Sequence, residues 1–154
     1  MEDLLKTLLE QEAKLQFVAF DENTAWKLGS AIVAEATARA LPIAIDIRRG
    51  DRQLFHASMP GASADNDQWI ARKVRTVNRF GHSSFYIGRF LASLGKTMAE
   101  KYYVSEQEYA AHGGCFPIIV KGTGMVGTVA VSGLPQEEDH RLVTECVAAL
   151  LGLR

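Results

Sequence analysis

Residues 112–140, HGGCFPIIVKGTGMVGTVAVSGLPQEEDH, contain the clearest indication of the fold. Gly122, Gly124 and Gly127 have the spacing Gly-x-Gly-x-x-Gly, which in dinucleotide-binding proteins joins a strand to the N-terminus of a helix. Residues 125–131 that follow are rich in β-branched side chains and favour a second strand instead. We therefore expect the glycines in a hairpin turn between antiparallel strands. Pro117 predicts that the first of these strands lies at a sheet edge.

The rest of the chain predicts helices around a second hairpin. Residues 43–47 alternate between isoleucine and other residues, so the isoleucines should face a core and Asp46 should face away from it. Gly81 and the serines after it are typical of a helix end followed by a helix cap. The expected elements are a helix within 4–15, a short strand at 17–20, a helix capped by Asp21 and ending near 41, strands at 43–47 and 53–57, a helix from about 67 to 80 capped by Asp65 or Asn66, a helix with apolar positions from 87 to 98, the glycine-rich hairpin, and a helix at 136–151. Two hairpins without βαβ alternation predict one α+β domain over 1–154 with an antiparallel sheet flanked by helices.

Composition restricts the classes of partner. The formal net charge is -1, which gives no support for a nucleic acid or a membrane surface as partner. The two cysteines lack the spacing of a zinc or haem-attachment motif. The N-terminal residues carry acids among leucines, unlike a signal peptide, and no apolar run approaches the roughly 20 residues of a membrane span. We therefore expect a cytoplasmic protein.

Two blocks of sequence resemble a known family. The segment from Gly113 to Asp139, with its glycine-rich turn and the run VGTVAVSG, resembles the haem-degrading-domain family of HbpS-like and GlcG-like proteins. The block DNDQWIARKVRTVNRFGHSS, residues 65–84, resembles its branch called uncharacterised protein family 0303. The resemblance implies a profilin-like fold, in which a five-stranded antiparallel sheet lies between helices in three α-β-α layers, and a homo-oligomer. It also makes haem a candidate cofactor, although this branch has no established activity.

A basic helix face is the first candidate site. Arg72, Arg75 and Arg79 share one face of the helix expected around them, and Lys73 lies beside them. One interpretation is a solvated or inter-subunit face. The other is a clamp for the carboxylates of haem or a small acid, because guanidinium groups bind carboxylates bidentately. Trp69 would add a flat apolar surface to such a clamp.

Histidines and glycines in loops provide the other candidates. Neutral imidazole ligates haem iron, and His82 and His112 lie in expected loops, where binding residues concentrate. No two histidines have the spacing of a helical metal pair, so no metal site is assigned. His82 or His112 remains a candidate ligand of haem iron. Gly113 and Gly114 either present N–H groups to an anion or bring the loop against the sheet. Cys115 has no adjacent feature that would activate its thiol.

Three classes of function remain open from the sequence. The first is an oligomeric small-ligand-binding protein for haem or another acidic planar molecule. The second is a structural or adaptor protein, because Trp and Arg are enriched at interfaces. The third is an enzyme that degrades haem or acts on a small metabolite, which rests on the resemblance alone. The residues predicted to bind the ligand are Trp69, Arg72, Arg75, His82, His112, Gly113 and Gly114.

Overall fold

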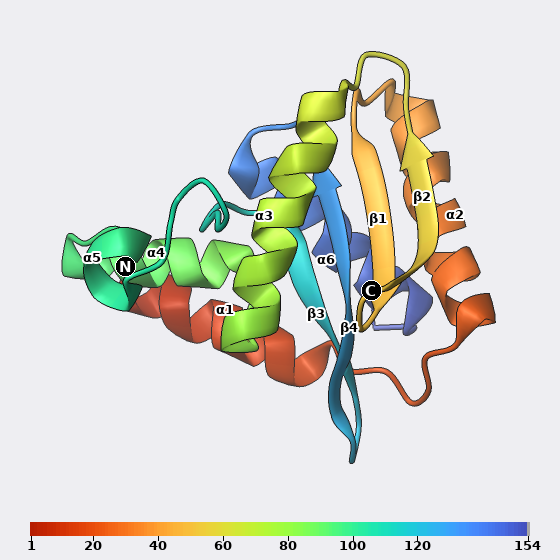
Figure 1. The fold of residues 1–154 in the computed structure, drawn as a ribbon. Helices are drawn as coiled ribbons and strands as arrows, with labels where there is room; N and C mark the ends of the chain where they lie inside the picture. Colours follow the sequence, from red (N-terminus) through yellow and green to blue (C-terminus); the bar gives the residue numbers. More distant parts are fainter. Residues whose placement is uncertain (154) are drawn as a thin grey trace.

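The computed structural model describes residues 1–153 and has an antiparallel sheet flanked by helices (Figure 1). The helices are α1 (Glu2–Lys14), α2 (Glu22–Arg39), α3 (Ala64–Phe80), α4 (Ser84–Leu94), α5 (Met98–Tyr102) and α6 (Gln136–Leu150). The strands are β1 (Ala44–Arg49), β2 (Arg52–Ser58), β3 (Cys115–Val120) and β4 (Gly124–Ser132). Among residues 1–153, no helix is both long and apolar enough to span a bilayer.

Both predicted hairpins are confirmed. The strand order is β2-β1-β4-β3, and every neighbouring pair is antiparallel. The glycine-rich segment forms the turn between β3 and β4, so its glycines do not open a helix. Pro117 lies in β3, an edge strand, as its missing N–H requires.

The prediction of a fifth strand is wrong, and the sheet has four strands. Of residues 17–20, only Phe17 pairs with the sheet, in one isolated parallel bridge to Val120. Its N–H donates to the Ile119 carbonyl, and its carbonyl accepts from Lys121. Val18 then faces solvent with 81% of its surface exposed, and Asp21 begins the cap of α2. The chain therefore leaves the sheet edge after one residue.

Helices cover both faces of the sheet (Figure 1). The larger core lies under α2 and α6, where Ile43, Ile45 and Ile47 pack with residues of β3 and β4. The other face packs against α3 through the small side chains of Ala44 and Ala130 and through Cys115. Asp46 faces α3, as the alternation predicts, but it is buried and bound by the Nε of Arg48 at 2.9 Å.

Two helix boundaries differ from the predictions. The α3 helix begins three residues early because Ser63, and not Asp65 or Asn66, is the N-cap, and its N–H donates to the Asn66 side chain at 2.9 Å. The helix expected to carry apolar residues as far as Met98 ends at Leu94, where the chain adopts a left-handed conformation at Gly95. Met98 starts the short α5 helix, and Leu94 is exposed.

Candidate functional site

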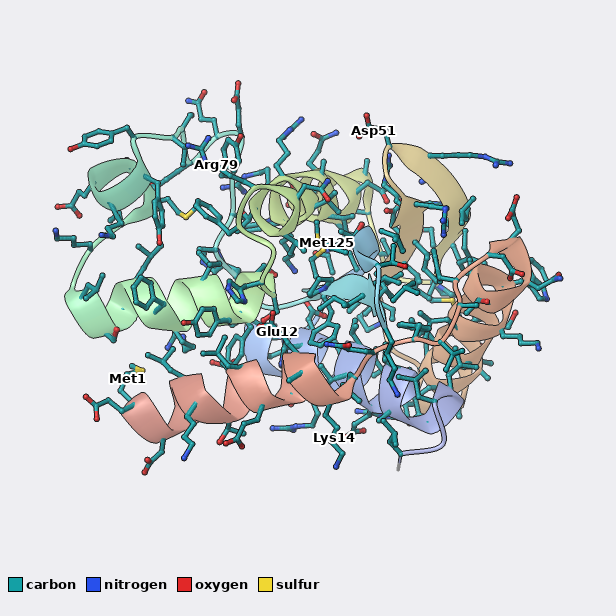
Figure 2. The ribbon with its side chains drawn as sticks, turned by 90° about the horizontal axis from the view of Figure 1, so that it is seen from below. Met1, Glu12, Lys14, Asp51, Arg79 and Met125 are labelled. Carbon is teal, nitrogen blue, oxygen red and sulfur yellow. The ribbon has the colours of Figure 1, made fainter. Side chains whose placement is uncertain are left out.

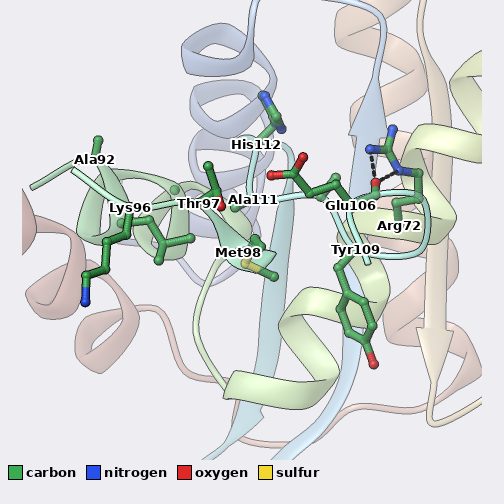
Figure 3. Close-up of a pocket in the computed structure, with 12 residues that line it drawn as sticks. Arg72, Ala92, Lys96, Thr97, Met98, Glu106, Tyr109, Ala111 and His112 are labelled. Carbon is green, nitrogen blue, oxygen red and sulfur yellow. Dashed lines mark hydrogen bonds between the residues drawn. The ribbon is translucent and has the colours of Figure 1, made fainter. Parts of the chain in front are cut away.

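Two hollows meet at His112. The first, which we call the α6 hollow, has a volume of about 290 Å³ and lies between the first turns of α3, the end of β4 and the start of α6. The second, the α4 hollow, has a volume of about 270 Å³ and lies between α3, α4, α5 and residues 106–112 (Figure 3). His112 lines both hollows, so its side chain stands where they adjoin.

The α3 helix and the segment before β3 place aromatic and basic groups around this histidine. The Trp69 ring meets the His112 ring edge to face, with centroids 5.3 Å apart. The Arg72 guanidinium lies 4.4 Å from the Trp69 ring centroid. Partial burial of the His112 ring lowers its pKa, and the positive charges of Lys73, Arg72 and Arg89 lower it further. The imidazole is therefore neutral at pH 7, the form that ligates metals.

Two of the arginines proposed as a carboxylate clamp hold the protein's own backbone. Arg72 donates through Nε and Nη2 to the carbonyl of Glu106, as Figure 3 shows. Arg75 donates through Nη1 to the carbonyl of Glu108 at 3.0 Å. Arg72 lines the α4 hollow, whereas Arg75 is not among the residues that line either hollow. The basic face therefore fixes the segment from 105 to 109 against α3.

A buried ion pair in the wall of the α6 hollow was not predicted. Lys73 Nζ lies 3.3 Å from Asp139 Oδ2 and donates to the Val131 carbonyl at 3.2 Å. The other carboxylate oxygen of Asp139 accepts from the Leu134 N–H. Burial lowers the pKa of Lys73 and raises that of Asp139 to about 6, while their mutual attraction opposes both shifts. The spacing of Lys73 from Ile70 and Val77 places it on the apolar stripe of α3, which was the available signal in the sequence.

The geometry of Gly113 and Gly114 supports the interpretation that these glycines bring the loop against the sheet. The Gly113 N–H donates to the Gln136 side chain at 3.0 Å, so an internal acceptor occupies it. Gly114 has a φ of +134°, and a Cβ there would overlap the Val131 carbonyl and the Lys73 ammonium. Glycine at this position therefore leaves space for the buried lysine.

The other candidate histidine, His82, is engaged elsewhere. Its Nδ1 lies 2.9 Å from Glu12 Oε1, which joins the turn before α4 to α1. Glu12 points from α1 toward the interior, whereas Lys14 of the same helix points outward (Figure 2). Burial raises the pKa of Glu12. His82 is not among the lining residues of either hollow, so the structure does not bring it together with Trp69 and His112.

Within the described part of the chain no metal cluster is formed, and the Cys115 thiol is not activated. Residues 1–153 contain no group of three or more His, Cys, Asp or Glu side chains that could hold a metal ion. Cys115 is fully buried, and this burial raises the pKa of its thiol far above the usual range. A thiol in this environment is inert.

The fold is that of a known class of protein. Residues 20–148 match the family described as "Haem degrading protein HbpS-like", and the chain belongs to this family. It is 50% identical over 145 residues to a UPF0303 protein of Streptomyces coelicolor, covering 94% of this chain and 92% of that protein. The crystal structure of Ybr137w protein is similar with a TM-score of 0.90 and 35% identity over 96% of this chain and 87% of that one. The PduOC:Heme complex shares the fold, with a TM-score of 0.70 and 18% identity over 86% of this chain and 95% of that one.

Proposed function

We propose that this protein binds a small planar molecule with acidic groups in the groove where the two hollows meet. The observation that carries the proposal is the position of His112, which lines both hollows and packs edge-on against Trp69. Aromatic walls with a few convergent polar groups are typical of ligand sites. Here the polar groups come from three separate elements, α3, the segment before β3, and the start of α6.

A tetrapyrrole is the best-specified ligand. Family membership and the haem-bound fold relative support it, and the depressed pKa of His112 keeps its imidazole in the form that ligates iron. Each hollow lies just below the roughly 300–1,000 Å³ typical of ligand pockets. A macrocycle would therefore need both hollows, with His112 at the metal and the Trp69 ring beside it, whereas a smaller acid would need one. Bound haem would supply a redox-active iron centre.

Haemin titration tests the proposal. A saturable Soret shift at a fixed haem-to-subunit ratio is expected for the native protein. His112→Ala should weaken haemin binding by at least roughly tenfold, because the loss of even an outer-shell partner of a metal ligand costs about 10–100-fold in affinity. His56→Ala is the matched control, because His56 lies on β2 and pairs with Asp67 outside both hollows. A featureless titration of the folded protein would reject the tetrapyrrole. Equal binding by His112→Ala would remove this residue from the site.

We further propose that the chain forms a homo-oligomer through the surface of α2 that carries Trp26. This side chain is 65% exposed, and its ring makes a T-shaped contact with the Phe55 ring, with centroids 5.7 Å apart. Tryptophan is enriched in buried interface centres. Trp26→Ser should lower the native mass in solution. The double variant Trp69→Ala with Arg75→Ala should leave the native mass unchanged. If the double variant lowers the native mass and Trp26→Ser does not, the subunit contact lies on α3.

A further inference from the structure

An apolar hollow lies at the C-terminal end of α2. We call it the α2 hollow, and its volume of about 400 Å³ exceeds that of either hollow at His112. Its walls come from the end of α2 and from the chain that follows β2, and the lining residues are Ala36, Thr37, Ala40, Leu41, Met59 and Pro60. None of these side chains carries a charge. The α2 hollow therefore suits a large apolar side chain and offers no charged group to an acidic ligand.

Trp26, the exposed tryptophan of α2, lies on the same side of the helix as this hollow. Thr37 follows Trp26 by eleven residues, which is about three helical turns, or roughly 16 Å along the axis. The two side chains therefore leave α2 in nearly the same direction. The connecting strip between them consists of half-buried apolar side chains, Val33 on α2 and Phe55 and Ala57 on β2.

These positions suit a two-fold contact between two copies of the chain. A two-fold axis perpendicular to α2, passing between Trp26 and Thr37, would make the α2 helices of the two copies antiparallel. The same rotation would bring each Trp26 to the α2 hollow of the other copy. One contact would then be made twice, as in an isologous interface. The surface is therefore complementary to itself, which identifies a second copy as its partner.

The charges at the two ends of α2 favour the same arrangement. The helix has an acidic first turn, with Glu22, and a basic last turn, with Arg39. Antiparallel packing brings the Glu22 end of one helix to the Arg39 end of the other, so opposite charges meet. Within one chain Glu22 pairs with Arg52 and Arg39 pairs with Glu35, all of them exposed or half-buried. These residues would form a polar rim around the uncharged connecting strip.

The strand beside α2 would also be covered by a second copy. The β2 strand is at the edge of the sheet, and it contacts α2, which runs in the same direction (Figure 1). Natural proteins usually cover or otherwise protect the edges of their sheets. A second copy on this surface would cover β2 together with the connecting strip.

We propose that two copies of this chain associate about a two-fold axis, with Trp26 of each copy inserted into the α2 hollow of the other. This inference rests on the homo-oligomer proposed above and adds the receiving surface and the symmetry of the contact. A tryptophan that becomes buried in a pocket is typical of the residues that dominate the affinity of an interface. Each dimer contains two such contacts, so a change to Trp26 or to the hollow acts twice.

Blocking the α2 hollow tests this contact separately from removing the tryptophan. Thr37 is exposed, so Thr37→Arg should fold while placing a charged side chain at the hollow. It should raise the dimer dissociation constant at least roughly tenfold, as Trp26→Ser should, measured by light scattering over a dilution series. Ala38→Arg is the matched control, because this exposed neighbour does not line the hollow and is turned about 100° around the helix.

A mixture of the two disruptive variants tests the reciprocal geometry. In a pair of one Trp26→Ser chain and one Thr37→Arg chain, the tryptophan of the second meets the unblocked hollow of the first. One of the two contacts is then restored. We therefore expect heterodimers in the mixture at concentrations where each variant alone is monomeric, detected by native mass spectrometry.

Two results would overturn the assignment. One is a folded Thr37→Arg protein that keeps the native mass while Trp26→Ser loses it, which would leave Trp26 at the subunit contact but not in the α2 hollow. The other is a mixture of the variants that forms no heterodimer. Ala40→Arg, at another exposed lining residue, replaces Thr37→Arg should that variant not fold. A native protein that stays monomeric at all concentrations would reject the homo-oligomer as well, whereas haemin binding is judged by its own titration.

Discussion

The Nε2 of His140 lies 2.8 Å from the Oε1 of Gln11, and this hydrogen bond joins the last helix to the first. With Oε1 as acceptor, Nε2 carries the proton, and the buried Nδ1 has no partner. The ring stacks on Phe85, with centroids 4.9 Å apart. His140 is therefore held as a neutral imidazole inside the protein, and burial lowers its pKa to about 4.

Acid should destabilise the fold through this residue. The unfolded chain, with a histidine pKa near 6.5, binds more protons than the folded chain between about pH 4 and 6.5. Protonation of His140 therefore leaves the free energy of unfolding unchanged above pH 6.5. As the pH falls from 6.5 toward 4, it lowers this free energy by on the order of 3 kcal/mol. Urea unfolding at a series of pH values measures this slope. His140→Leu should make the free energy of unfolding depend less on pH, whereas the surface variant His56→Gln serves as the control. An unchanged slope in His140→Leu would assign the acid sensitivity to other groups.

Removing Lys73 should leave the Asp139 carboxylate buried without its cation. We expect Lys73→Met to lower the free energy of unfolding by about 3–5 kcal/mol at pH 8, as when one partner of a buried pair is lost. The loss should be smaller at pH 5, because Asp139, whose pKa burial already raises to about 6, can then be protonated. Denaturant titrations at both pH values make the comparison, with exposed Lys6→Met as control. A loss independent of pH would mean that packing, and not charge, dominates.

The segment from 105 to 109 should open when its anchor on α3 is removed. Arg75 holds the Glu108 carbonyl, and a hydrogen bond from a charged donor contributes about 1.5–3 kcal/mol. Arg75→Gln should therefore accelerate cleavage after Glu106 and Glu108 by a glutamate-specific protease roughly tenfold or more, in proportion to the population of the opened segment. The control variant Arg39→Gln should be cleaved at the rate of the native protein. Equal rates for both variants would show that other contacts close the segment.

Gly88→Ala should disturb the groove without touching any candidate ligand group. The added methyl group would overlap the Ala111 carbonyl, so α4 and the chain before His112 must separate. Overpacking of this kind costs about 1–3 kcal/mol. We expect a lower melting temperature together with weaker haemin binding, measured on the same preparation. Ser93→Ala on the exposed side of α4 is the control, and a Gly88→Ala protein that melts lower but binds normally would place the ligand away from the α4 hollow.

The elements of the fold could be predicted where the residue pattern is local. The alternating isoleucines of β1, the capping residue Asp21 and the glycine-rich turn each determine their own neighbourhood. Whether residues 17–20 form a fifth strand could not be predicted from the local pattern, because the pairing of Phe17 depends on Val120, which is 103 residues away. The early start of α3 reflects competition between Ser63 and two acidic or amide residues with similar capping ability.

The candidate site was predictable only in part for the same reason. Trp69 and His112, predicted separately, lie in contact, whereas His82 faces Glu12 of α1. Arg72 and Arg75 are basic residues on a helix face, but the acceptors that engage them are backbone carbonyls, which no sequence pattern reveals. The same limitation applies to Lys73, whose buried carboxylate partner, Asp139, lies 66 positions away in the sequence.

The single bridge of Phe17 has a consequence for how the sheet meets other chains. Along the outer side of β3, the Cys115 N–H is bound by the Ser84 hydroxyl, Pro117 has no N–H, and Phe17 occupies the Ile119 carbonyl and the Lys121 N–H. A foreign strand that approached this edge would find few donors to pair with. Fibril-like growth from the β3 side is thereby blocked by one hydroxyl, one imino acid and one residue of a loop, and any strand added to the sheet would have to dock on β2.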